Sequence, residues 1–383
     1  MAKKDINKSK FDNGTHLKLD IFRECFRAWF PVLANDKYTE KIFVYDLFAG
    51  SGTDAHGDYG SPLVLLDEAK GDKKQFCNFV NNKDKEITFI FNEKEVDKAE
   101  ALKKGIITYF EDCQSDCEFS KCAYKAKVEV KNDTFINVFQ SSSFENVLKD
   151  RRVGKFVLLD QYGYKEISDE IFLKLVAYPK TDFIFFIASN YVKRFKSLPA
   201  VTDYFQKIGS TNFNESEPKE CHRIIADYFR QLMPPNKEYY LHHFSYLKKT
   251  NYYGLIFGTN HTYGMEKFLS VCWSHDRLSG ESTENMYNDF EVGSLFYNPG
   301  NSNKKQEIKH LVEEEILNLR IKTNVEGFKF VLSKGCQTSL YLECIEDLIN
   351  SKRVSIDGKF NKKVTSIHQL KGDKIYTINV LSQ

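Results

Sequence analysis

Apolar residues along the chain alternate between helical spacing and the short unbroken runs of buried strands. Apolar positions three and four apart predict helices at 16–33, 96–104 and 169–177. Unbroken apolar runs predict parallel strands at 42–45, 87–91, 128–130, 156–159 and 183–188. Two later runs, 239–244 and 252–258, predict a closing antiparallel pair. Strands that alternate with helices indicate a doubly wound α/β sheet, whose ligands lie at the carboxyl ends of the strands.

The pattern changes at residues 297–304, whose sequence YNPGNSNK is typical of a linker. Beyond it, 306–319 and 338–350 have helical spacing, and the apolar runs 354–356 and 375–380 flank a turn and a basic stretch. Helices followed by a two-stranded ribbon predict a winged helix. The predicted organisation is a disordered basic tail at 1–13, a sheet domain at 14–296 with a cysteine-containing insertion near 105–125, and a winged-helix domain at 304–383.

Composition narrows the class of protein. The chain has 383 residues, 42% hydrophobic and 14% aromatic, which is enough for a folded core and long enough for two or three domains. Its formal net charge of +2 provides no overall field for nucleic acid, so a basic surface must be local. No apolar run has the length of a membrane span, and the polar start does not resemble a signal peptide. The nine cysteines, an odd count, favour reduced thiols and a cytoplasmic location.

A strand that ends in an acid and a glycine turn is the first candidate for chemistry. The sequence VYDLFAGSG places Asp46 at the end of a predicted strand, and Gly50 and Gly52 in the turn after it. Glycine allows positive φ and lets the backbone approach a ligand closely. The P-loop pattern GxxxxGK[ST] does not occur, and GxGxxG is not met because the next glycine is Gly57. The turn fits the looser (D/E)xxxGxG pattern of S-adenosylmethionine-dependent methyltransferases.

Further acids follow the next strands. Glu93 comes after the second strand, where a carboxylate accepts hydrogen bonds from a ribose diol in folds of this class. The alternative is a solvated acid at a helix start, favoured by the helix dipole. Asp133 follows the third strand and is a candidate for holding an adenine amino group, with an ordinary turn aspartate as the equal alternative.

The fourth strand ends in the sequence LLDQYGY. Asp160 is the candidate that accepts a hydrogen bond from an exocyclic amine, and Tyr162 or Tyr164 would stack on a flipped base. The alternative is a turn aspartate with two packing tyrosines. Ser189 and Asn190 close the fifth strand and are weaker candidates for the same site.

The motifs VYDLFAGSG, GSPL at 60–63, FIFNEKE at 89–95 and LLDQYG at 158–163 occur in the order seen in the three-Cys-motif partner family, TcmP, which the chain resembles. The N-terminal segment HLKLDIFRECFRAWF and the later YYGLIFGTNHTYGMEKF are also similar. The resemblance covers residues 14–280, and the tail after 300 resembles the winged-helix segment of many members. It implies a Rossmann-like methyltransferase fold.

The resemblance also implies S-adenosylmethionine as cofactor and a three-Cys-motif protein as a partner. Under it, the catalytic residues are Asp160 and Tyr162. The implied cofactor-binding residues are Asp46, Phe48, Ala49, Gly50, Gly52, Ser61, Glu93 and Asp133. The LDPFG-like turn of the family is also similar to that of tRNA guanine-N2 methyltransferases, which points to a base amino group. Here Gln161 replaces the proline that would rigidify this turn, so a catalytically inactive scaffold is the alternative.

Cysteines form a second cluster. Cys113, Cys117 and Cys122 have the spacing Cx3Cx4C and could bind zinc with a fourth ligand such as Cys77. The favoured alternative is unpaired reduced thiols in an insertion, because zinc fingers use tighter pairs.

The basic stretch 351–374 carries seven lysines and arginines against two aspartates. Placed on a wing, these cations would contact phosphates without reading sequence. The candidates are Lys352, Arg353, Lys359, Lys362 and Lys363. A solvated hairpin, or a surface for a protein, is the alternative. Taken together, the sequence predicts a methyltransferase that acts on a nucleic-acid base amine, and a clustered set of nuclease carboxylates is not evident.

Overall fold

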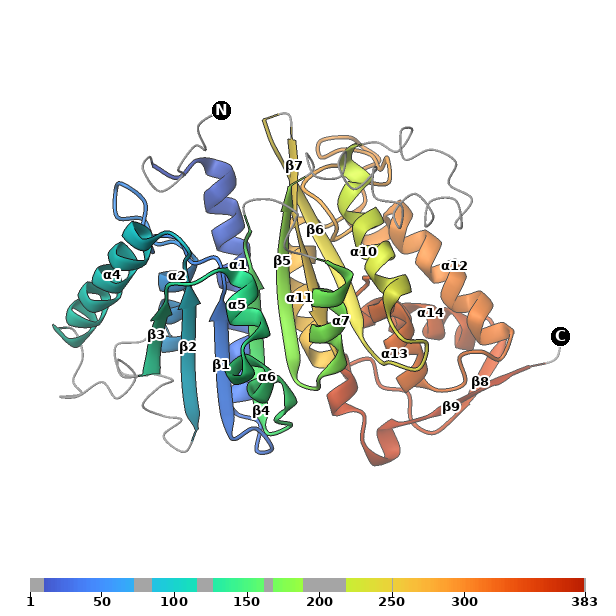
Figure 1. Cartoon of the computed structure of the whole chain (residues 1–383). Coiled ribbons are helices and arrows are strands. Elements are labelled where there is room, and N and C mark those ends of the chain that lie inside the picture. Colours follow the sequence, from blue (N-terminus) through green and yellow to red (C-terminus); the bar gives the residue numbers. More distant parts are fainter. Residues whose placement is uncertain are drawn as a thin grey trace.

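A seven-stranded sheet lies at the centre of the computed structural model (Figure 1), which describes residues 10–71, 85–115, 127–161, 168–188, 218–249 and 251–381. Its strands are β1 (Lys41–Asp46), β2 (Glu86–Asn92), β3 (Val128–Lys131), β4 (Val153–Leu159), β5 (Thr181–Ala188), β6 (Tyr240–Lys248) and β7 (Asn251–Thr259). The strand order is β3-β2-β1-β4-β5-β7-β6, and β7 alone runs antiparallel to both of its neighbours. This is the strand order of a Rossmann-like methyltransferase sheet, so the predicted doubly wound α/β sheet is confirmed, whereas the winged-helix domain stays a prediction.

Helices cover both faces of the sheet (Figure 1). One face packs against α1 (Asn13–Ala34), α2 (Ser61–Lys70), α4 (Val96–Ser115) and α11 (Thr262–His275). The other face packs against α5 (Phe135–Gln140), α6 (Ser142–Lys149), α7 (Asp169–Ala177) and α10 (Cys221–Leu232). Alternate residues of one strand serve the two faces, as in β1, where Val44 faces the first layer and Tyr45 the second. Burial on both faces explains why these strands are continuous apolar runs.

The predicted strands and the helices at 16–33 and 169–177 all lie within observed elements, and the two later runs are the antiparallel pair β6 and β7. Helix α4 is longer than the predicted 96–104, and it includes 105–115 of the segment predicted as an insertion. No helix in the described part of the chain has both the length and the apolar character needed to cross a membrane.

The C-terminal segment contains three helices and a two-stranded ribbon. Its elements are α12 (Asn303–Leu317), α13 (Asn324–Ser333), α14 (Thr338–Asn350), β8 (Val354–Asp357) and β9 (Thr377–Val380). Helix α13 was not predicted, although its capping box between Thr323 and Glu326 is visible in the sequence as T-x-x-E. Thr323 also forms an isolated antiparallel bridge with Thr377 of β9.

Apolar residues on both sides of the predicted 297–304 linker share one core. Phe268 and Trp273 of α11 belong to the same buried cluster as Val331 of α13 and Tyr341 of α14. The Trp273 indole also donates a hydrogen bond to the Gly335 carbonyl, at 3.1 Å. The boundary at 297–304 stays a prediction, and the C-terminal segment is packed firmly onto the helix that follows the sheet.

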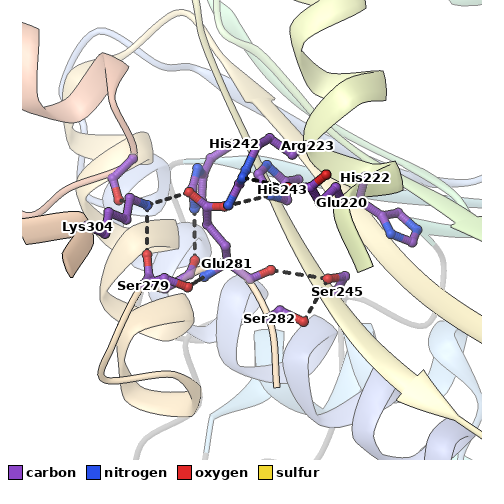
Figure 2. A network of polar contacts seen from close by, with 12 residues as sticks. Glu220, His222, Arg223, His242, His243, Ser245, Ser279, Glu281, Ser282 and Lys304 are labelled. Atoms are coloured by element: carbon purple, nitrogen blue, oxygen red, sulfur yellow. Dashed lines mark hydrogen bonds and ion pairs between the residues drawn. The ribbon is translucent and has the colours of Figure 1, made fainter. Parts of the chain in front are cut away.

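A buried carboxylate, that of Glu281, joins the C-terminal segment to the sheet (Figure 2). Glu281 is 4% exposed, and its oxygens lie 2.6 Å from the Arg223 guanidinium, 2.8 Å from Lys304 Nζ and 3.4 Å from His243 Nε2. Burial alone would raise the pKa of Glu281, but Lys304, His243 and Arg223 hold it well below its usual range. Lys304 of α12 also donates to the Ser279 carbonyl at 2.7 Å. The network therefore connects α10, β6, residues 279–281 and α12.

Removing one cation from this network should destabilise the fold. We expect Lys304→Met to lower the free energy of unfolding by about 3 kcal/mol, because a buried carboxylate loses a charge partner. The matched control is Lys309→Met on the same helix, whose surface pair with Glu343 should be worth about 1 kcal/mol or less. Urea unfolding followed by circular dichroism measures both, and equal losses would contradict the assignment.

Candidate functional site

Three acidic side chains come together at the carboxyl edge of the parallel strands. In the sheet register, Asp46 at the end of β1 lies opposite Phe91 of β2 and Leu158 of β4. Glu93 follows β2 by one residue, and Asp160 follows β4 by one residue. The sequence predicted this edge as the site, and the sheet brings all three acids to it.

The turn after β1 needs its two glycines. Gly50 and Gly52 have φ of 64° and 84°, in the left-handed region that ordinary residues rarely adopt. A Cβ on Gly52 would also lie 2.8 Å from Leu102 Cδ1 of α4. The Gly60 amide donates to the Gly52 carbonyl at 2.8 Å, which places Ser61, the buried first residue of α2, beside the turn.

Asp46 is fully buried, at 0% exposure. Its Oδ1 accepts a hydrogen bond from the Phe48 amide at 3.2 Å, whereas its Oδ2 has no hydrogen-bond partner among the residues that the structure describes. Burial raises the pKa of Asp46 to about 7, with a further contribution from the Asp160 charge, and the Ser61 hydroxyl and the Phe48 amide oppose the rise. A buried acceptor without a partner is costly, and a ligand that supplies a donor would relieve this cost.

Asp160 forms an ion pair that the sequence did not predict. Lys18 of α1 places Nζ 2.6 Å from Asp160 Oδ2, and the two side chains are only 9% and 14% exposed. The Lys18 ammonium also lies 4.6 Å from the ring centroid of Phe186 of β5. The sequence does indicate that Lys18 is buried, because it lies three and four residues before Ile21 and Phe22, on the apolar face of its helix.

The Glu93 carboxylate lies directly against the glycine turn. It accepts hydrogen bonds from the Gly50 amide at 3.0 Å and from the Glu95 amide at 2.8 Å. The second bond is that of an acid at a helix start, as in the alternative interpretation, and the ribose role of Glu93 stays a prediction. Next to this turn, the Phe48 ring stacks on Phe135 with the ring centroids 5.1 Å apart.

Asn92, a residue not singled out from the sequence, ties three strand ends together. It is 1% exposed, and its side-chain amide donates to the Leu47 carbonyl at 3.4 Å and to the Asp133 carbonyl at 3.0 Å. Its backbone carbonyl accepts from the Ala49 amide at 2.9 Å. The exposed Asp133 carboxylate accepts from the Thr134 amide and from Asn137 Nδ2, both at 2.7 Å, so it supports the start of α5. Its adenine-binding role stays a prediction.

Several candidates lie outside the described residues. These are Tyr162, Tyr164, Ser189, Asn190, Cys77, Cys117 and Cys122. Cys113 lies in α4 and is half-buried. Within the described ranges, no group of three or more histidine, cysteine or acidic side chains is placed to hold a metal ion.

Two of the five predicted phosphate-binding residues already have acidic partners. Arg353 forms an ion pair with Glu313 of α12, and Lys362 forms one with Glu346 of α14. Lys352, Lys359 and Lys363 are exposed. The solvent-facing side of α14 is itself acidic, because it carries Glu343, Glu346 and Asp347.

A cavity of about 350 Å³ lies apart from this edge, between α11, the start of α14 and residues 365–369. The Glu266 carboxylate in its wall accepts from the Ser366 hydroxyl and from the Ile367 amide, the latter at 3.0 Å. No residue of the carboxyl edge lines this cavity, so we place the candidate site at the strand ends, where the glycine turn and the acids meet.

No family model matches the sequence, and a comparison with curated proteins finds no match. Among solved structures, the chain is similar to Trm1 from Pyrococcus horikoshii with S-adenosyl-L-methionine, at 10% identity over 97% of this chain and 92% of that one, with a TM-score of 0.34. It is similar to an O-methyltransferase from Bacillus cereus in complex with SAH, at 12% identity over 65% and 91%, with a TM-score of 0.32. At such TM-scores the fold is assigned from the strand order of this sheet itself.

Neutralising Asp46 should stabilise the protein at alkaline pH. The folded protein binds the Asp46 proton with a pKa of about 7, against about 3.9 in an unfolded chain, so this group lowers stability as the pH rises through that interval. We expect Asp46→Asn to raise the free energy of unfolding at pH 8 by up to about 4 kcal/mol, at about 1.36 kcal/mol per pKa unit. At pH 5 the gain should shrink to less than half.

Asp54 supplies a control of opposite sign. Burial alone would raise the pKa of Asp54, but hydrogen bonds from the amides of Phe11, His56 and Asp58 lower it below its usual value. Asp54→Asn should therefore lose stability at pH 8. Thermal unfolding at the two pH values measures both variants, and a loss for Asp46→Asn at pH 8 would mean that its carboxylate is stabilised in the folded protein.

Proposed function

We propose that the chain is an S-adenosylmethionine-dependent methyltransferase. The observation that carries this proposal is the fully buried Asp46 carboxylate, whose Oδ2 has no partner in the described structure, at a strand end beside a glycine turn. When bound, the cofactor supplies an electrophilic methyl group and two cationic groups, a sulfonium and an ammonium. A site that contains a buried carboxylate acceptor complements such a ligand.

The other edge residues have roles that follow from their places. Gly50 and Gly52 leave the turn open to close approach, and Phe48, Ala49 and Ser61 flank it. The Glu93 carboxylate, already against the Gly50 amide, is the acceptor for ribose hydroxyls. A role for Asp133 at the adenine remains part of the proposal.

Asp160 is the residue that we propose holds the accepting amine. Its Oδ2 is bound to Lys18, so its second oxygen is the one that accepts a hydrogen bond from an exocyclic amine of a base. This bond orients the amine and increases its nucleophilicity as positive charge develops. Tyr162 would stack on the base, by the resemblance of the turn.

A scaffold that has lost catalysis is the second candidate. The Asp160–Lys18 ion pair favours it, because the proposed catalytic carboxylate already has a cation bound, and so does Gln161 in place of the family's proline. A three-Cys-motif protein is then the partner that the resemblance implies.

The six free cysteines among the described residues support the proposed reducing, cytoplasmic location.

The C-terminal segment is proposed to be a winged helix that contacts nucleic acid. Three helices, the β8–β9 ribbon and the Thr323–Thr377 bridge support this interpretation. Its acidic α14 is poorly suited to enter a groove lined by phosphates. The contact would instead be made by the loop after β8, where Lys359 and Lys363 form no ion pair with any described residue.

Calorimetric titration with S-adenosylhomocysteine tests the cofactor. We expect the protein to bind it, and Gly50→Arg to lose the binding, because an arginine at this φ strains the turn and fills the approach. Asp160→Asn keeps a group that accepts from Lys18, so it should bind with an affinity within about threefold of the native protein. Transfer of labelled methyl from S-adenosylmethionine to nucleic acid should fall at least about a hundredfold in this variant.

The outcomes separate the two candidates. A folded protein that does not bind at millimolar ligand, or that binds but transfers no methyl to any RNA or DNA tested, would favour the scaffold. An equal loss of binding in Asp160→Asn would make Asp160 a cofactor or folding residue.

The charge reversal Lys359→Glu/Lys363→Glu tests the nucleic-acid surface. We expect the affinity for RNA or DNA to fall at least tenfold. The slope of log affinity against log salt concentration, measured by filter binding, should fall by the equivalent of about two phosphate contacts. The control Lys37→Glu/Arg151→Glu makes the same change of charge on two other exposed residues, which lie just before β1 and just before β4. Equal losses in both double variants would point to net charge rather than a surface.

A further inference from the structure

The buried Lys18 ammonium has N–H donors that form no hydrogen bond with any described residue. Lys18 is 7% exposed, and its one hydrogen bond among the described residues goes to Asp160 Oδ2, at 2.6 Å. An ammonium has three donors, so two remain without a hydrogen-bond partner in the part of the chain that the structure describes. The rings of Phe186 and Phe22, with centroids 4.6 Å and 5.7 Å away, flank the ammonium but accept no conventional hydrogen bond.

The charges around Lys18 do not balance. Lys18 is close enough to both Asp46 and Asp160 to lower the pKa of Asp46, against the larger effect of burial and the opposing charge of Asp160. With Asp46 ionised, two carboxylates share one ammonium. The same edge therefore contains a buried acceptor without a partner, Asp46 Oδ2, and a buried ammonium with unused donors. A ligand group that carries both an ammonium and a carboxylate would satisfy both.

We propose that Lys18 binds the carboxylate of the cofactor's amino-acid end. This inference rests on the proposed function, because the amino-acid end belongs to S-adenosylmethionine. The ligand's ammonium, sulfonium and carboxylate bring one net positive charge, which matches the one net negative charge of Lys18, Asp160 and an ionised Asp46. These three side chains and the ligand are then neutral together, and Lys18 keeps its bond to Asp160 while a second donor reaches the ligand.

The position of Lys18 is fixed by contacts at the start of α1. The Phe11 amide donates to Asp54 Oδ2 at 2.7 Å, in the loop that follows the glycine turn. Asp12, the N-cap of α1, lies 2.6 Å from Lys248 Nζ at the end of β6. The helix start therefore spans from the loop after β1 to β6, and Lys18 is held over the edge before any ligand binds.

Two ligands that differ only in the carboxylate test this assignment. Calorimetry would compare S-adenosylhomocysteine with its decarboxylated analogue, which keeps the adenosyl group, the sulfur and the amine. We expect the native protein to bind the analogue at least about tenfold more weakly. In Lys18→Met this ratio should fall to about one, because the variant has no ammonium to distinguish the two ligands. Arg27→Met is the matched control, since it removes another cation of α1, one that pairs with Glu68 of α2, and it should keep the native ratio.

Each outcome bears on a different claim. If the native protein binds neither ligand, both the proposed function and the role of Lys18 are overturned. If it binds both ligands equally, or if Lys18→Met weakens both by the same factor, the cofactor site stands and Lys18 is only a positioning residue for Asp160. Should Lys18→Met fail to fold by circular dichroism, Lys18→Gln replaces it, because it also removes the cation: a lowered ratio supports the assignment and an unchanged ratio contradicts it.

Discussion

Carboxylates buried beside the central sheet constrain how the rest of the chain packs. A buried carboxylate costs several kcal/mol unless a cation and hydrogen bonds accompany it. Asp160 obtains its cation from Lys18 of the N-terminal helix, and Glu281 obtains one of its cations from Lys304 of α12. The N-terminal helix and the first helix of the C-terminal segment are thus each held by an ion pair, and a shifted packing of either helix would leave a buried charge unpaired.

The two buried carboxylates differ in how completely they are satisfied. Glu281 has partners on both oxygens, including Arg223, Lys304 and the Tyr287 hydroxyl, so the carboxylate itself is fully paired and structural. The carboxyl edge instead retains an acceptor on Asp46 without a partner and a lysine with unused donors. Polar groups that the fold itself leaves unsatisfied are typical of sites that bind ligands, whereas a carboxylate paired on both oxygens contributes to stability.

Most of the sheet and the outline of the site could be predicted from sequence, because they depend on local features. Buried parallel strands are short apolar runs, and the left-handed turn at Gly50 and Gly52 requires glycine, so both are visible without knowledge of distant residues. Parallel strands also place their carboxyl ends at one edge by geometry. This is why acids such as Asp46 and Glu93, far apart in the chain, could be assigned to one site.

Pairings across the fold could not be predicted in this way. Lys18 and Asp160 are separated by 142 positions, and only packing of α1 on the sheet brings them together. Arg353 and Lys362 were assigned to phosphates from composition, but the partners Glu313 and Glu346 lie on other helices. Helix α13 was missed because its capping signal is short. The position of a lysine can be read from the sequence, whereas its ion-pair partner depends on the tertiary structure.

The packing of α1 on the sheet has a consequence for synthesis of the protein. Among the described elements this helix is synthesised before the sheet on which it packs, yet its packing is completed by α11, where His275 lies 2.9 Å from Glu24. At about 5–20 residues per second, translation reaches α11 roughly 10 to 50 s after α1 has emerged. During that interval the apolar face that carries Phe22, Phe26 and Phe30 is incompletely covered on the nascent chain. A chaperone that binds amphipathic helices on the ribosome would find its target in α1.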